Sequence, residues 1–211
     1  MTPKQAAFAT LAETMIKNLE KRNITGHYFD DCTALCSYLK ETLPQGAVIS
    51  WGGSESLTES GVMDLLRAGD YSLIDRALAK TPQEAREIFS RIVLSDYYFM
   101  STNAITLDGE LVNVDGNGNR VAALAQGPSH VYLIVGRNKV SSNVEDAMNR
   151  VRNIAAPANV KRLNKQTPCQ ITGRCGDCQS PDCICSHTVI TRHSCHKDRI
   201  HVLLVNEELG Y

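Results

Sequence analysis

The chain has 211 residues, 43% of them hydrophobic and 21% charged, with 22 Lys and Arg residues against 23 Asp and Glu residues. This length favours one large domain or one domain with an appendage, and it leaves ample chain for a hydrophobic core. A net charge of −1 argues against a general nucleic-acid binder, which would carry a basic excess, and no apolar run approaches the ~18 residues of a membrane span. The N-terminus has neither an apolar signal core nor a cleavage-site pattern, so we expect a cytoplasmic protein.

The N-terminal third alternates the patterns of helices and strands. Thr2 as N-cap and Pro3 at the first helical position begin a helix, and a second helix follows from Asp31. The continuous apolar run at 47–51 is typical of a strand that is covered on both faces. The elements expected up to residue 94 are, in chain order, a helix from Pro3, a strand at 24–29, a helix from Asp31, a strand at 47–51, a helical stretch to about Ala68, a strand at 71–75 and a helix from Thr81 to about Leu94.

The middle of the chain contains a predicted β-hairpin. Alternating sequence surrounds the pair Asp108-Gly109, which predicts a type I′ turn because both central residues of that turn need positive φ. After Pro157 the periodic pattern of helices and strands ends, and a cysteine-rich segment follows. Repeated strand–helix units with one hairpin predict an α/β fold with a mostly parallel sheet. The elements expected after the hairpin are a helix at 121–125, a strand at 131–135, a helix that Ser142 and Glu145 begin with a capping box, and a last strand at 200–205.

A glycine-rich turn, Gly52-Gly53-Ser54, follows the strand at 47–51 and precedes a helix. Backbone N–H groups at the start of a helix favour an anion such as phosphate or carboxylate, and glycines let it approach closely. Glycine pairs also make ordinary tight turns, and Glu55 and Glu59 suit the helix dipole without any ligand. An anion site and a purely structural turn therefore both remain open here.

A second polar region combines residues 101–104 with the loop at 115–120 across the hairpin. Arg120 can clamp a carboxylate or phosphate with two hydrogen bonds, and Asp115 is the nearby candidate for a general base. The alternative for Asp115 is an Asx-turn that stabilises the loop. Because a stretch so rich in polar residues and glycine is costly to order, a functional site is favoured. The catalytic candidates are Asp115 and Arg120, and the substrate-binding candidates are Gly52, Gly53, Ser54, Asn103, Asn117, Asn119 and Arg120.

Six of the eight cysteines lie between residues 169 and 195. In a reducing compartment such a local cluster indicates a metal site rather than a disulfide framework. Thiolates bind zinc and iron–sulfur clusters, but a single Cys-x2-Cys matches neither the paired zinc ribbon nor the bacterial ferredoxin run. Unpaired surface thiols are the structural alternative. The cysteines at the spacing x5, x2, x6 are Cys169, Cys175, Cys178 and Cys185, and the additional candidate ligands are Cys183, Cys195, His187, His193 and His196.

Several of these segments together resemble the lactate-utilisation (LUD) domain family, in particular its short single-domain members. The resemblance implies a fold of the NagB/RpiA/CoA-transferase group, with a Rossmann-like, mostly parallel sheet flanked by helices. It also implies a single domain over residues 1–211, with residues 165–197 as a Cys-rich insertion before the last strand. The segments that carry the resemblance are 51–54, 101–123, 135–139, 153–159 and 204–210.

The cysteine spacing resembles a pattern of the same subgroup, which selects Cys169, Cys175, Cys178 and Cys185 as metal ligands and leaves Cys183 and Cys195 additional. Some members of the family belong to a bacterial system that oxidises lactate to pyruvate, in which sister subunits carry iron–sulfur clusters. The resemblance therefore implies an iron–sulfur cluster, with zinc as the alternative, and there is no nucleotide-binding motif.

The leading interpretation is a protein that binds a small anionic or carboxylate metabolite. It would take part in hydroxy-acid oxidation, or in the associated electron transfer through the Cys-bound centre, as an oxidoreductase component. One alternative is a non-redox metabolite-binding or interaction module with a structural zinc, and another, from fold analogy alone, is an isomerase, hydrolase or acyl-transfer activity. The expected partners are the small anion, iron–sulfur sister subunits and, as a homodimer, a second copy of the chain.

Overall fold

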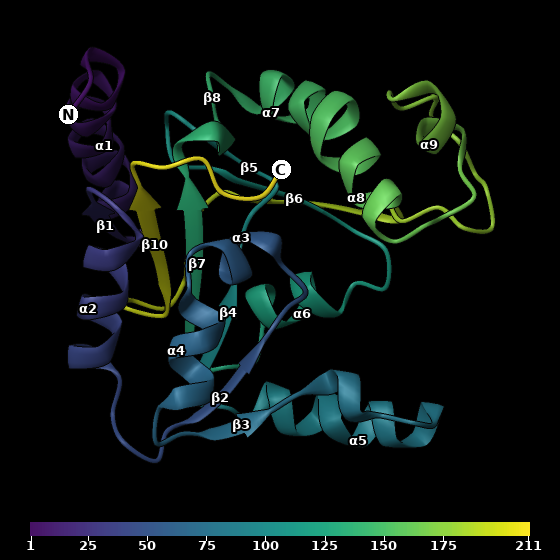
Figure 1. Cartoon of the computed structure of the whole chain (residues 1–211), viewed down its shortest axis with the longest axis horizontal. Coiled ribbons are helices and arrows are strands. Elements are labelled where there is room, and N and C mark those ends of the chain that lie inside the picture. Colours follow the sequence, from purple (N-terminus) through teal and green to yellow (C-terminus); the bar gives the residue numbers. More distant parts are fainter.

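The computed structural model describes residues 1–211 and contains two β-sheets. The larger sheet has the strand order β1-β10-β7-β4-β2-β3, and all of its neighbouring strands are parallel. The predicted α/β class, with a mostly parallel sheet flanked by helices, is confirmed (Figure 1). The strands of this sheet are β1 (Thr25–Phe29), β2 (Val48–Trp51), β3 (Ser72–Ile74), β4 (Tyr97–Met100), β7 (His130–Gly136) and β10 (Ile200–Val205).

The smaller sheet has the strand order β8-β5-β6-β9. Its central pair, β5 (Ala104–Thr106) and β6 (Leu111–Asp115), is the predicted hairpin, and β8 (Val140–Ser141) runs parallel to β5. On the other side, β9 (His187–Thr191) pairs with β6 in antiparallel register. The cysteine-rich segment, for which no regular element was expected, therefore contributes an edge strand to the hairpin.

The hairpin turn differs from the predicted type I′ turn. Gly109 has a positive φ of 89°, whereas Asp108 is not among the residues with positive φ. The Gly109 N–H donates to the Thr106 carbonyl at 2.9 Å, and the Thr106 N–H donates to the Glu110 carbonyl at 3.0 Å. This is the pattern of a three-residue loop that ends on a left-handed glycine. The Asp-Gly pair predicted the position of the turn but not its type.

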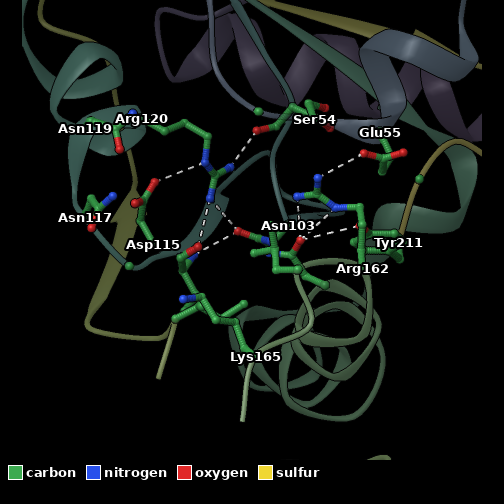
Figure 2. Close-up of a pocket in the computed structure, with 18 of the residues that line it drawn as sticks. Ser54, Glu55, Asn103, Asp115, Asn117, Asn119, Arg120, Arg162, Lys165 and Tyr211 are labelled. Atoms are coloured by element: carbon green, nitrogen blue, oxygen red, sulfur yellow. Dashed lines mark hydrogen bonds and ion pairs between the residues drawn. The ribbon is translucent and has the colours of Figure 1, made fainter. Parts of the chain in front are cut away.

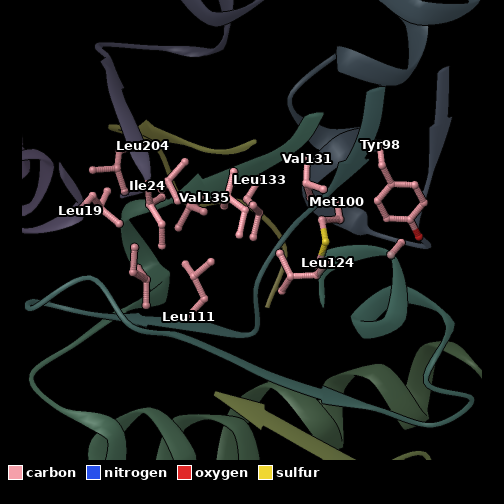
Figure 3. Close-up of a cluster of buried hydrophobic side chains, with 14 of the residues drawn as sticks. Leu19, Ile24, Tyr98, Met100, Leu111, Leu124, Val131, Leu133, Val135 and Leu204 are labelled. Carbon is pink, nitrogen blue, oxygen red and sulfur yellow. The ribbon is translucent and has the colours of Figure 1, made fainter. Parts of the chain in front are cut away.

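Helices cover both faces of the larger sheet. Along β7, Val131, Leu133 and Val135 pack with one buried cluster, while Tyr132 and Ile134 pack with a second cluster on the opposite face. The first cluster includes residues of α1, α5, α6 and the hairpin, and the second includes residues of α2, α3 and α4. Figure 3 shows the first cluster, in which Leu111 of the hairpin approaches Leu133 and Val135 of β7. The hairpin is therefore fixed against the sheet.

The helices agree with the sequence pattern at most of their starts. The capping box predicted for Ser142 and Glu145 is wrong, because the N-cap is Asn143, whose side chain accepts from the Asp146 N–H. No helix has both the length and the apolar character needed to cross a membrane. The helices are α1 (Pro3–Lys21), α2 (Cys32–Thr42), α3 (Glu55–Glu59), α4 (Val62–Ala68), η1 (Arg76–Leu78), α5 (Pro82–Val93), α6 (Asn119–Ala125), η2 (Arg137–Lys139), α7 (Val144–Arg150), the π-helix η3 (Val151–Ala155), α8 (Ala156–Arg162) and α9 (Pro168–Thr172).

Candidate functional site

A cavity of about 600 Å³ lies beyond the carboxyl ends of β2 and β4 (Figure 2). Its walls come from the glycine-rich turn after β2, the loop after β4, the polar loop after β6, and the cysteine-rich segment. Ligands of open α/β sheets commonly bind outside the carboxyl ends of the strands. The structure thus brings the two predicted polar regions into one site. The predicted binding residues that line this cavity are Gly53, Ser54, Asn103, Asn117, Asn119 and Arg120, together with Asp115.

Gly52 lies behind the cavity wall instead of in its lining. Its N–H donates to the Phe99 carbonyl at 2.9 Å, so this group is part of the sheet and is not free for an anion. A Cβ atom at this position would lie 3.0 Å from the Tyr98 hydroxyl oxygen and 3.3 Å from the Arg120 side chain. Glycine is therefore needed at residue 52 for close packing, which agrees with the structural interpretation of this part of the turn.

Arg120 is largely buried, with 14% of its side chain exposed, and all five of its N–H groups donate to protein acceptors. Burial lowers the pKa of its guanidinium, and the neighbouring Asp115 carboxylate opposes this shift. The predicted two-bond clamp on a ligand is absent from this arrangement, since no N–H group is left over. Arg120 still contributes a positive charge to the cavity. The acceptors are Asp115 Oδ2 (3.2 Å), Ser101 O (2.8 Å), Asn113 Oδ1 (2.9 Å), Asn103 Oδ1 (2.8 Å) and Val114 O (2.9 Å).

Both carboxylate oxygens of Asp115 are also engaged. One accepts from the Gly118 N–H at 2.9 Å, and the other accepts from Arg120 Nε at 3.2 Å. These contacts match the alternative interpretation, in which Asp115 stabilises the loop. A catalytic role for Asp115 or Arg120 stays a prediction.

The charges that line the cavity do not balance. Every lining carboxylate pairs with a lining cation, so Arg76 and Lys139 are left without a carboxylate partner. The lining cations are Arg76, Arg120, Lys139, Arg162 and Lys165. The pairs are Asp115–Arg120 at 3.2 Å, Glu55–Arg162 at 3.4 Å and Asp182–Lys165 at 3.4 Å.

Lys139 was not identified as a site residue from the sequence. It is the last residue of η2, directly after β7, and it is only 4% exposed. Its Nζ donates to Ser56 Oγ at 2.8 Å and to Ser101 Oγ at 3.0 Å. Burial, with the nearby guanidinium groups of Arg150 and Arg120, lowers the pKa of Lys139 to about 7. The sequence feature that could have identified Lys139 is its position soon after a continuous apolar strand.

Arg76 was also missed. It begins η1, after β3, and lies on the exposed rim of the cavity. When the Asn119 amide is oriented with its oxygen toward Arg76, it accepts from Arg76 Nη1 at 2.8 Å. Its remaining N–H groups are free to bind an anion. No local pattern marks this residue, because β3 and the polar loop meet only in the folded chain.

The cysteine-rich segment forms the remaining wall, and Cys183 lines the cavity. Burial and the neighbouring thiols of Cys183, Cys175 and Cys169 raise the pKa of Cys185 to about 12. The thiols of Cys183, Cys175 and Cys169 thus lie near that of Cys185, and the full ligand set, Cys178 included, stays a prediction. All eight cysteines are free thiols, and no three His, Cys, Asp or Glu side chains are placed to hold a metal ion.

The sequence matches the model of the LUD domain over residues 12–205. The structure resembles a DUF162 family protein from Deinococcus radiodurans, with 12% identity and a TM-score of 0.55 over 93% of this chain and 97% of that chain. It also resembles ribose 5-phosphate isomerase from Plasmodium falciparum, with 17% identity and a TM-score of 0.34 over 53% and 52% of the two chains. A third likeness is to eIF2B delta from Chaetomium thermophilum, with 17% identity and a TM-score of 0.36 over 66% and 57%. No curated protein sequence matches the chain.

Proposed function

We propose that this chain, which belongs to the LUD domain family, binds a small anionic metabolite in the cavity. Arg76 carries this proposal, because it is a permanent cation that lines the cavity without a carboxylate partner. Lys139 adds a further positive charge when it is protonated. A volume of about 600 Å³ suits a small molecule. A carboxylate such as that of a hydroxy acid or keto acid is the simplest group that meets both requirements.

Each cavity group has a distinct part in this binding. Arg76 offers a planar guanidinium that can donate two parallel hydrogen bonds to a carboxylate or phosphate. The Ser54 hydroxyl makes no capping hydrogen bond to helix α3, which leaves it available to the ligand. Arg120 adds charge without a free N–H group and holds the loops that carry Asn103 and Asn117 in place.

Isothermal titration calorimetry with lactate, pyruvate and inorganic phosphate tests this proposal. We expect at least one of these anions to bind, and Arg76→Gln to weaken that binding about 10- to 100-fold, as for the loss of a charged hydrogen bond. Arg67→Gln is the matched control, because Arg67 is exposed on α4 and pairs only with Asp64 at 3.9 Å. No binding to the unchanged protein, or equal binding by the Arg76 and Arg67 variants, would contradict an anion site.

We also propose that the gathered thiols hold an iron–sulfur centre beside this cavity, with zinc as the alternative. Cys169, Cys175, Cys183 and Cys185 would supply four soft, charged ligands, which suit either group, once the segment closes around the metal, because the four thiols are not arranged as a ligand set without it. An iron–sulfur cluster would carry one electron at a time, so it would pass on to a further acceptor, in two steps, the two electrons that oxidation of a hydroxy acid to a keto acid releases. The position of Cys183 in the cavity wall favours this second proposal, because it would place the electron acceptor next to the anion.

Metal analysis with visible absorption, on protein purified without air, distinguishes these two metals. About four irons per chain and a brown colour are expected for a cubane cluster on four cysteines. One zinc per chain without colour would instead mean that the metal only stabilises the fold of the segment. We expect Cys183→Ser to remove the metal and Cys178→Ser to retain it, because the Cys183 thiol lies beside that of Cys185 and in the cavity wall. The opposite result would restore the ligand set expected from the sequence, and protein without metal would refute both versions.

A further inference from the structure

The hydrogen bonds of Lys139 define how its amine faces the cavity. Nζ donates to Ser56 Oγ and Ser101 Oγ, at 2.8 and 3.0 Å. Both hydroxyls donate their own protons elsewhere: Ser56 to the Leu209 carbonyl at 3.1 Å, and Ser101 to the Ile134 carbonyl at 2.6 Å. Each serine oxygen must therefore accept from Lys139, and the lysine must supply two N–H groups.

A neutral amine has two N–H groups and one lone pair, so these two serines use both of its hydrogens. The remaining position on Nζ carries either a third hydrogen or the lone pair, and Lys139 lines the cavity. The charged groups nearby are Arg150 and Arg120, which disfavour the ammonium form, and Glu59, which favours it weakly. No ion pair involves Lys139. Burial without a carboxylate is a recognised way to obtain a nucleophilic lysine.

We propose that Lys139 forms an imine with a small carbonyl compound that carries a carboxylate or phosphate group. This inference rests on the proposed function, because Arg76 is the group that would hold the anionic end. It goes further, because it assigns a covalent step to the cavity and restricts the ligand to aldehydes and ketones.

The chemistry requires no oxidant and no second co-reactant. The lone pair of Lys139 Nζ attacks the carbonyl carbon, a C–N bond forms, and the carbonyl electron pair moves to oxygen, which takes a proton. Nitrogen then loses one proton to solvent, the C–O bond breaks, and the oxygen leaves as water with a further proton from solvent. The product is a protonated imine, whose single N–H group can still donate to Ser56 or Ser101.

Reductive trapping tests this inference. The full chain is incubated with pyruvate, with dihydroxyacetone phosphate or with pyridoxal 5′-phosphate, then treated with cyanoborohydride, and the labelled peptides are identified by mass spectrometry. We expect the adduct on Lys139 to exceed that on Lys165 at least tenfold. Lys165 lines the same cavity but is half-exposed and paired with Asp182, so it is the internal control. Labelling by pyruvate alone would indicate a carboxylate ligand, and labelling by dihydroxyacetone phosphate alone would indicate a phosphate ligand.

Two variants show whether the amine itself is responsible. Lys139→Arg keeps a cation but cannot form the imine, and Lys139→Met removes the amine altogether, so each should lose the adduct. A melting curve at pH 7 checks that each variant is folded. If both variants fail to fold, labelling of the unchanged chain against pH decides, with half-maximal labelling expected near pH 7. Calorimetric binding of pyruvate without any adduct on Lys139, from any of the three probes, would overturn the imine and leave the anion site intact. Absence of both would overturn the proposed function as well.

Discussion

The ammonium group of Lys139 is buried next to permanent cations, so its protonation is coupled to folding. Burial, then Arg150 and Arg120, lower its pKa from 10.5 to about 7 in the folded chain, and Glu59 opposes this weakly. Between these two values the unfolded chain binds the additional proton, so the free energy of unfolding rises with pH across this window. Below pH 7 both states are protonated and this contribution is flat.

Lys139→Met should therefore change how stability depends on pH. Relative to this variant, the unchanged protein should gain up to about 1.4 kcal/mol of unfolding free energy per pH unit between pH 7 and 10. Urea unfolding at several pH values measures the free energy of unfolding of both proteins. Subtracting one curve from the other removes the contributions of groups that titrate alike in both. Lys161→Met, on the exposed surface of α8, is the control and should give no such slope. Parallel curves for the unchanged protein and the Lys139 variant would show that the amine titrates normally.

The strands that position the cavity differ in how well the sequence predicts them. The long apolar strand β7 and the hairpin β5–β6 have strong local patterns, and both were predicted. The strand β4 was missed, although it lies between β7 and β2, because the four-residue run at 97–100 is too short to show a period. The strand β9 was missed because its partner β6 lies more than seventy residues earlier, at Leu111↔Thr191 for example, and pairing of that kind leaves no local signal.

The site residues also differ in this way: those with a local sequence pattern were predicted, and those that depend on long-range contacts were not. The glycine-rich turn and the polar loop were each predicted as parts of a binding site from their glycine and polar residues. That they line one cavity follows only from the folded chain, because the turn comes after β2 of the larger sheet and the loop after β6 of the smaller sheet. The hydrogen bonds of Arg120 could not be predicted, since its five N–H groups donate to acceptors in two separate segments, 101–103 and 113–115. For the same reason Arg76 and Lys139 emerged as the unpaired cations only after the pairs of the folded chain were known.

The cavity lies between the side of the larger sheet and the cysteine-rich segment, and these two sides are held in the fold by different contacts. The sheet side is held by the two buried clusters. The cysteine-rich side joins the molecule mainly through β9, at the edge of the smaller sheet, and through contacts such as the Cys175 N–H to the Arg152 carbonyl at 2.9 Å. In Figure 1, α9, near the start of this segment, stands apart from the larger sheet. A ligand in the cavity would contact both sides at once.

Anion binding should therefore slow backbone hydrogen exchange on both sides together. We expect added protection at residues 53–56 after β2 and at residues 181–186 of the cysteine-rich segment, since both line the cavity, and local opening must break ligand contacts. Hydrogen exchange with mass spectrometry, with and without the anion that calorimetry identifies, measures this. Arg76→Gln should lose the protection in both segments at the same ligand concentration, whereas Arg67→Gln should retain it. Protection confined to residues 53–56 would mean that the anion does not reach the cysteine-rich wall, which would separate the binding site from the thiols and remove the structural basis for electron transfer between them.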